Sequence, residues 1–266
     1  MVSTSDNSVP EAGTTARNKL DISGLRISYG EKVVLDEVSL SVQEGEIFGI
    51  IGPANAGKTS FLKALNRMDM FDSQMNVEGN ILFDGHDIHN IRNVYALRRR
   101  IGVVFPLPVG LPLSVYDNVA LAPRLAGITA KAELDIIVEQ CLMRAALWEE
   151  VKDRQQTLGS MLSGGQQQRL TIARALSQGP DLLMLDEFSI AVDPVTTMRI
   201  EEVLSQLKDE ITIILVTNLV QQARRIADRT AFFLDGACVE IAPTEELFTG
   251  VVEDPRTRAY VDGRFG

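Results

Sequence analysis

The chain has 266 residues, with 36 acidic and 26 basic side chains and a formal net charge of −10 at pH 7. Because 45% of the residues are hydrophobic and 23% are charged, the chain can bury a core, which excludes disorder throughout its length. The acidic balance argues against a protein that binds nucleic acid through its overall charge, and we expect no nucleic-acid partner.

The N-terminal part predicts a short tail followed by strands. Residues 1–19 are rich in Ser, Thr, Asn, Pro and Gly and are expected to form a disordered tail. The alternating apolar residues of 25–29 are typical of a half-buried strand. Two further apolar segments, 33–35 and 38–42, predict a small antiparallel sheet with it.

The next elements surround a glycine-rich segment. Residues 46–51 predict a short buried strand that runs into Gly52, and residues 58–68 predict the helix beyond it. A strand pair with an Asp-Gly turn is expected over 80–88, and another strand over 101–105.

The rest of the chain predicts a helical insert and a parallel sheet. Residues 114–147 have helical periodicity. The apolar runs 181–186 and 211–217 are typical of strands buried on both faces, and the helix between them implies a right-handed parallel crossover. We therefore predict an α/β fold with a parallel core, an antiparallel edge and a helical subdomain over about 106–178.

The remaining local signals are weak. Cys141 and Cys238 lie in apolar stretches and are expected to pack in the core, and His86 and His89 are expected in a solvated turn without a metal. The longest apolar runs are shorter than the about 20 residues of a membrane helix, and the N-terminus lacks the apolar core of a secretory signal. We expect a cytosolic protein, peripheral if it acts at a membrane.

The segment GPANAGKTS fits the phosphate-loop pattern G-x-x-x-x-G-K-[ST] between a strand and a helix. Backbone amides there would surround the phosphates of ATP, Lys58 would reach the β- and γ-phosphates, and the Thr59 hydroxyl would bind Mg²⁺. The residues expected to form this site are Gly52, Pro53, Ala54, Asn55, Ala56, Gly57, Lys58, Thr59 and Ser60. The alternative is a glycine-rich turn that binds nothing.

Two further segments support the nucleotide-site hypothesis. The strand LLMLDE ends at Asp186, expected to hold Mg²⁺, and Glu187 follows as the candidate general base for the attacking water. LSGGQQQR opens a helix with a second anion site. The residues expected at that site are Ser163, Gly164, Gly165 and Gln166.

Because LSGGQQQR is its signature segment, the chain resembles the ATP-binding subunit of ABC transporters over about residues 20–266. The resemblance implies a P-loop ATPase core and a head-to-tail homodimer, in which Ser163 and Gly165 complete the partner's site. It implies that Tyr29 stacks on adenine and that Asp193 crosses the dimer interface. Membrane permease subunits are the implied partners, with an external solute-binding protein as an indirect one.

Within the family, the segments FLKALNRM, SVYDNVAL, RIADRTAFFLDG and YVDGRFG are similar to the phosphate-import ATPase. An importer for another small solute is the alternative. An ABC-type ATPase acting on DNA or ribosomes usually carries two cassettes or a long coiled coil, and this chain has one cassette and no sustained heptads.

The chain departs from the family at several positions. Pro106 replaces a glutamine, and Asn218 replaces the switch histidine, so it can bond a γ-phosphate but carries no proton charge. FSIAVD replaces a loop rich in Pro, Thr and Ser, and Asn55 replaces a glycine at a position where asparagine tolerates left-handed angles. Either these changes are tolerated in a working importer, or the chain is a slowly hydrolysing regulatory paralogue.

Overall fold

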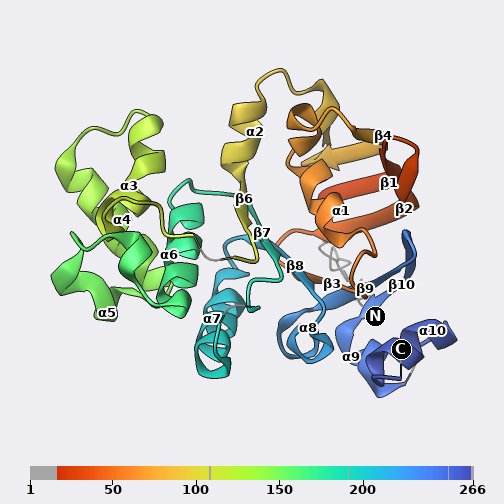
Figure 1. Cartoon of the computed structure of the whole chain (residues 1–266). Coiled ribbons are helices and arrows are strands. Elements are labelled where there is room, and N and C mark those ends of the chain that lie inside the picture. The colour runs from red at the N-terminus through yellow and green to blue at the C-terminus, as the bar shows by residue number, and fades with distance from the viewer. Residues whose placement is uncertain (1–16, 108, 191, 251, 265–266) are drawn as a thin grey trace, which may run out of the picture.

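The computed structural model describes residues 17–107, 109–190, 192–250 and 252–264 (Figure 1). A mainly parallel sheet lies in the middle of the molecule, with the antiparallel sheet on one side and the helices from α3 (Val115–Leu125) to α6 (Gly164–Leu176) gathered on the other. The predicted α/β architecture is confirmed, and the helices α3 to α6 lie between residues 115 and 176.

The antiparallel sheet has the strand order β2-β1-β4-β5. Its strands are β1 (Asn18–Tyr29), β2 (Lys32–Gln43), β4 (Met75–Phe83) and β5 (His86–Asp87). The predicted boundary of the tail is too late, because β1 begins at Asn18 and pairs it with Gln43. The rest of the predicted tail, residues 1–16, lies outside the described residues. The apolar segments 33–35 and 38–42 form one strand, which continues through Glu37 at a φ of 50°.

The second sheet has the order β10-β9-β3-β8-β7-β6 and is parallel except for the β9–β10 hairpin. Its strands are β3 (Ile47–Ile51), β6 (Ile101–Val104), β7 (Leu182–Asp186), β8 (Thr212–Thr217), β9 (Arg229–Leu234) and β10 (Ala237–Pro243). Every residue of β3, β7 and β8 is buried, as their continuous apolar runs predict. Since β8 lies between β3 and β7, the carboxyl ends of these strands share one edge of the sheet.

Helices cover both faces of this sheet and build the insert. Within the described residues the α-helices are α1 (Lys58–Leu65), α2 (Val94–Arg100), α3 (Val115–Leu125), α4 (Lys131–Arg144), α5 (Trp148–Val151), α6 (Gly164–Leu176), α7 (Pro194–Leu207), α8 (Val220–Ile226), α9 (Thr244–Thr249) and α10 (Pro255–Val261). Short 3₁₀ turns are η1 (Met68–Phe71), η2 (Ile88–Asn90), η3 (Lys152–Arg154) and η4 (Gly159–Met161). The helical range 114–147 is interrupted after α3, where Gly127 adopts a φ of 99° that favours glycine.

The two cysteines and the two histidines differ in their exposure. Cys141 is buried and Cys238 half-buried, and burial raises the pKa of the two thiols to about 11 and about 12. His86 is exposed and His89 half-buried, and the described residues contain no cluster suited to a metal ion. None of the helices in the described part is both long and apolar enough to cross a membrane.

Candidate functional site

The predicted phosphate loop joins β3 to α1 and depends on left-handed backbone angles. Gly52 has a φ of 154°, and a Cβ added there would lie 2.1 Å from the carbonyl oxygen of Phe233, so only glycine fits. Gly57, at a φ of 95°, is the N-cap of α1. Asn55 adopts a φ of 65°, which agrees with the expectation that asparagine replaces glycine there without difficulty.

The side chain of Lys58 folds back onto the loop and forms hydrogen bonds with its backbone. Its side chain is 5% exposed, and Nζ donates to the carbonyl oxygens of Gly52 at 2.8 Å and Pro53 at 2.9 Å. Nζ also lies 3.7 Å from Oε1 of Glu187. Burial lowers the pKa of Lys58, whereas the charges of Glu187 and Asp186 raise it. The ammonium group is thus held where the loop, α1 and the end of β7 meet.

Thr59 and Asp186 form the part of the site that suits a metal. The Thr59 hydroxyl donates to Oδ2 of Asp186 at 2.9 Å, while Oδ1 has no partner among the described residues. Asp186 is 2% exposed, and burial raises its pKa. A buried, unpaired carboxylate oxygen beside a hydroxyl matches the oxygen ligands that Mg²⁺ prefers. These two residues would hold the ion, whose charge would offset that of the phosphates.

Glu187 is presented to the same site by a strained backbone. Its φ is 44°, uncommon for a residue with a Cβ, and its amide donates to the carbonyl oxygen of Val216 at 2.8 Å. Glu187, Asp186, Lys58 and Thr59 all line one pocket of about 400 Å³. An acid with this placement can act as a general base toward a water beside a bound phosphate.

Pro106 lines this pocket as well, so the departure from the family lies at the site itself. Proline offers no side-chain donor or acceptor there. Asn218 follows β8 and is exposed, and it is absent from the described residues that line the pocket.

The other predicted loop residues take different positions. Ala54, Asn55, Gly57 and Ser60 line the pocket, whereas Ala56 is 2% exposed and packs into the core. Only the backbone of Ala56 is therefore available to a ligand. Tyr29 does not line the pocket, but its hydroxyl lies 3.4 Å from Oγ of Ser60, at the end of the loop.

The signature segment lies outside the pocket. Ser163 is the N-cap of α6 and forms a capping box with Gln166, whose amide lies 3.4 Å from Oγ of Ser163. A Cβ at Gly165 would lie 2.9 Å from Cγ2 of Thr196 at the start of α7. Asp193 caps α7 by accepting from the Thr196 amide at 3.0 Å, so it lies beside the signature segment. Gly164 is exposed on the same turn.

Glu150 supports the signature helix and was not predicted. Its Oε1 accepts from Nη1 of Arg169 at 2.7 Å, and its Oε2 accepts from Nε2 of Gln166 at 2.8 Å. Arg169 is 3% exposed. The acid comes from α5 and its partners from α6, so no local sequence pattern marks the pair.

A second unpredicted network joins the loop after Glu187 to α8, the helix that follows Asn218. Gln222 is fully buried and donates to Oγ of Ser189 at 3.2 Å and to Oε1 of Glu201 at 3.1 Å. Arg225 donates twice to Glu201, at 2.7 and 2.6 Å. The altered loop FSIAVD thus keeps a buried hydroxyl, that of Ser189, bonded to Gln222 of α8.

Comparison with solved structures gives the same fold. CbiO1 from Clostridium perfringens, part of the ABC transporter complex CbiONQ, is 25% identical with a TM-score of 0.78, over 88% of this chain and 92% of that chain. The ATP-binding cassette MJ0796, a dimer in a post-hydrolysis state bound to ADP and Pi, is 28% identical with a TM-score of 0.73, over 85% and 98%. A bacterial Atm1-family ABC exporter with ATP bound is 23% identical with a TM-score of 0.77, over 94% of this chain and 43% of that one, and shows the fold alone.

The sequence itself also matches a family model. The model of the ABC transporter family covers residues 35–189, a stretch that runs from β2 through the phosphate loop and the signature segment to the loop after Glu187. Because this match spans more than half of the chain, the chain belongs to the ABC transporter family, as an ATP-binding domain with its P-loop ATPase fold.

Proposed function

We propose that the chain is the ATP-hydrolysing subunit of a membrane importer for inorganic phosphate. The observation that carries the ATPase part is the convergence of Lys58, Thr59, Asp186 and Glu187 on one pocket. In this reaction Lys58 binds the β- and γ-phosphates, Thr59 and Asp186 hold Mg²⁺, and Glu187 accepts a proton from the attacking water.

A second copy of the chain completes each site. The signature segment Leu162–Arg169 contributes none of the described residues that line the pocket, although Ser163 and Gly164 are exposed at the start of α6. Amides at the start of a helix lack partners within it and favour an anion. A head-to-tail dimer brings this turn to the γ-phosphate of the partner's ATP. The cassette MJ0796, which has this fold, is a dimer in its ADP-bound structure.

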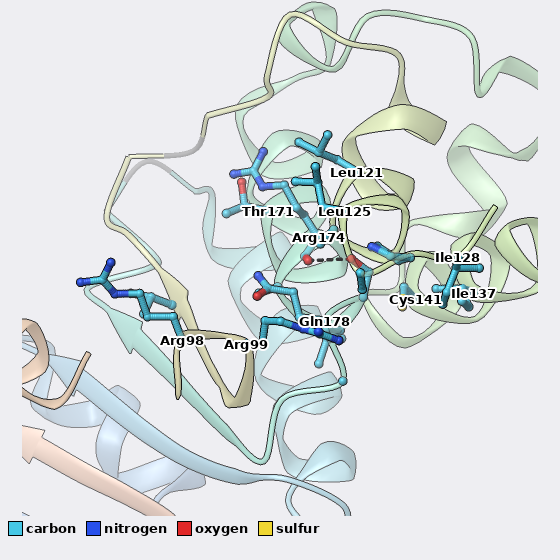
Figure 2. A pocket seen from close by; sticks show the side chains of 18 of the residues that line it. Arg98, Arg99, Leu121, Leu125, Ile128, Ile137, Cys141, Thr171, Arg174 and Gln178 are labelled. Atoms are coloured by element: carbon cyan, nitrogen blue, oxygen red, sulfur yellow. Dashed lines mark hydrogen bonds between the residues drawn. The ribbon is translucent and has the colours of Figure 1, made fainter. Parts of the chain in front are cut away.

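A groove between α2 and the helical insert supports docking of a permease subunit. It has a volume of about 900 Å³, and Figure 2 shows Arg99 and Arg174 on the side of the apolar residues, whereas Arg98 points away from them and donates to the carbonyl oxygens of Asn66 and Arg67. Leu125 on its rim is 81% exposed. Within the described part of the chain the groove contains four arginines, including Arg144, and no acidic residue. The fitting occupant is an amphipathic segment of the permease that carries a carboxylate.

The choice of phosphate rests on sequence resemblance. The segments FLKALNRM, SVYDNVAL, RIADRTAFFLDG and YVDGRFG fall in or beside α1, α3, β9 and α10, and the last two residues of YVDGRFG lie outside the described residues. Hydrolysis is slow in this proposal, because Pro106 lines the pocket and its side chain can form no hydrogen bond with the attacking water.

Uptake of radiolabelled phosphate tests the proposal in cells that lack the chain's gene. The wild-type gene is expected to restore uptake, and Lys58→Ala to abolish it. Arg99→Glu in the groove is expected to abolish uptake while the purified protein keeps its ATPase activity. Arg92→Glu is the matched control, since Arg92 is exposed but does not line the groove. Restored uptake of another solute, with phosphate uptake unaffected, would replace phosphate by that solute.

A further inference from the structure

The turn that follows Glu187 is anchored by buried side chains. The carbonyl oxygen of Glu187 accepts from the amide of Ile190 at 3.2 Å, which closes the turn. Inside it, Phe188 is fully buried and Ser189 is 7% exposed. A residue with a strained φ, such as the 44° of Glu187, keeps that angle only where the surroundings fix the backbone. The contacts of Phe188 and Ser189 therefore help to determine where the Glu187 carboxylate lies.

The hydroxyl of Ser189 contacts a buried amide of α8. Gln222 is fully buried, its Nε2 donates to Oγ of Ser189 at 3.2 Å, and this hydroxyl donates to Oε1 of Gln222 at 3.4 Å. The same Nε2 donates to Oε1 of Glu201 at 3.1 Å. Because an ionised carboxylate only accepts hydrogen bonds, Glu201 fixes which end of the amide faces it. The amide of Gln222 thus has one orientation, in which it can bond the Ser189 hydroxyl.

Glu201 is itself held in place. It belongs to α7 and is 4% exposed, and Arg225 donates to its two carboxylate oxygens at 2.6 and 2.7 Å. A bidentate pair between a guanidinium and a carboxylate has a specific geometry. Contacts between α7 and α8 therefore fix the amide of Gln222 and, through it, the hydroxyl of Ser189.

We propose that Gln222 is a positioning residue for the proposed general base Glu187: its amide holds the Ser189 hydroxyl and so keeps the turn that directs the Glu187 carboxylate to the nucleotide pocket. The role rests on the proposed ATPase function, and it adds a residue of α8 that lies outside the phosphate loop, the segment LLMLDE and the signature segment. Gln222 and Ser189 are not among the described residues that line the pocket, so their effect on the reaction passes through Glu187.

This position predicts which kinetic constant changes. The proposed phosphate and metal contacts come from Lys58, Thr59 and Asp186, none of which is bonded to Gln222 or Ser189 within the described part of the chain. A small displacement of the base slows the chemical step without removing a contact to the nucleotide. Loss of the link should therefore lower kcat and leave the affinity for MgATP unchanged.

Two single variants and their combination test the link. Gln222→Met keeps an unbranched side chain of similar length without the amide, and Ser189→Ala removes only the hydroxyl. Thr230→Val is the matched control, because it removes another buried hydroxyl, 2.7 Å from Oγ1 of Thr244, and neither threonine is among the described residues of the pocket. The value of kcat for MgATP is measured on the purified full chain, and Kd is taken from the dependence of Tm on MgATP concentration.

We expect Gln222→Met and Ser189→Ala each to lower kcat about threefold to tenfold and to leave Kd within twofold of wild type. The double variant should lose no more activity than the less active single variant, since both substitutions break one link. Thr230→Val should lower Tm and leave kcat within twofold of wild type. Wild-type kcat in both single variants overturns the inference, as do losses that multiply in the double variant or an equal loss in Thr230→Val. If Gln222→Met does not fold, the kcat of Ser189→Ala decides alone.

The variant Glu187→Gln separates this inference from the proposed function. It should lower kcat more than either single variant, because it removes the proposed base itself. A wild type without ATPase activity, or a fully active Glu187→Gln protein, would show that the proposed function is wrong, and the inference fails with it. A strong loss in Glu187→Gln beside wild-type kcat in the Gln222 and Ser189 variants would overturn the inference alone.

Discussion

The substitution Asp186→Asn separates two effects of the Asp186 carboxylate, one on the nucleotide-free fold and one on the loaded site. The carboxylate is 2% exposed, the Thr59 hydroxyl donates to one of its oxygens, and the other oxygen has no partner among the described residues. A buried polar atom without a partner costs about 1–3 kcal/mol. The raised pKa of Asp186 also indicates a destabilising effect. A carboxyl group whose pKa rises on folding destabilises the fold once the pH exceeds its pKa in the unfolded chain.

Asparagine keeps the shape of the side chain and removes its charge. We therefore expect the nucleotide-free variant to be more stable than wild type by about 1 kcal/mol, or about 2–4 °C in Tm. With MgATP we expect the wild type to be the more stable protein. A ligand at 100 times its Kd stabilises the wild type by about 2.7 kcal/mol, and the variant should gain less because it lacks one of the proposed metal ligands.

Thermal melts of Asp186→Asn and wild type with no nucleotide, with MgATP, and with ATP plus EDTA measure both effects. The EDTA sample is the control, since it removes the metal from the wild type as the substitution does from the variant. The reasoning is refuted if the nucleotide-free variant melts below wild type, or if MgATP raises the Tm of both proteins equally.

Three other substitutions or measurements test separate parts of the account. Glu150→Ala leaves the buried Arg169 without its carboxylate and should lower the free energy of unfolding in urea by about 3 kcal/mol, whereas an unchanged value would show that the pair is unimportant. Because the pKa of the Cys141 thiol is about 11, iodoacetamide at pH 8 should label its peptide on the order of a hundredfold more slowly than free cysteine, and faster as the pH rises. The double variant Pro106→Gln, Asn218→His should raise kcat about tenfold with little change in ATP affinity, and an unchanged kcat would mean that both departures are neutral.

The strands and the phosphate loop could be predicted because their causes are local. The apolar runs of β3, β7 and β8 are short and uninterrupted, as in strands that are buried on both faces. Gly52 and Gly57 stand at two positions of the loop where the backbone has a positive φ that favours glycine. The left-handed angle at Asn55 agrees with the expectation, drawn from the family resemblance, that asparagine can replace a glycine of the loop there.

What could not be predicted depends on contacts between distant segments. Glu150 and Arg169 are ordinary charged residues until α5 and α6 pack together. Tyr260 looks like one aromatic residue of a C-terminal helix, and only in the folded chain does its ring stack on Phe232 of β9. The start of β1 at Asn18 follows from pairing with Gln43, which outweighs the polar composition of the preceding residues.

The central claim is that two copies of the chain close on ATP, each supplying a phosphate loop to one site and a signature segment to the other. Analytical ultracentrifugation of Glu187→Gln tests it most directly, because slowed hydrolysis traps the closed state. The account predicts a monomer without nucleotide, a dimer with MgATP, and a monomer in both conditions when Lys58→Ala is added. A Glu187→Gln protein that remains monomeric at saturating MgATP would contradict it.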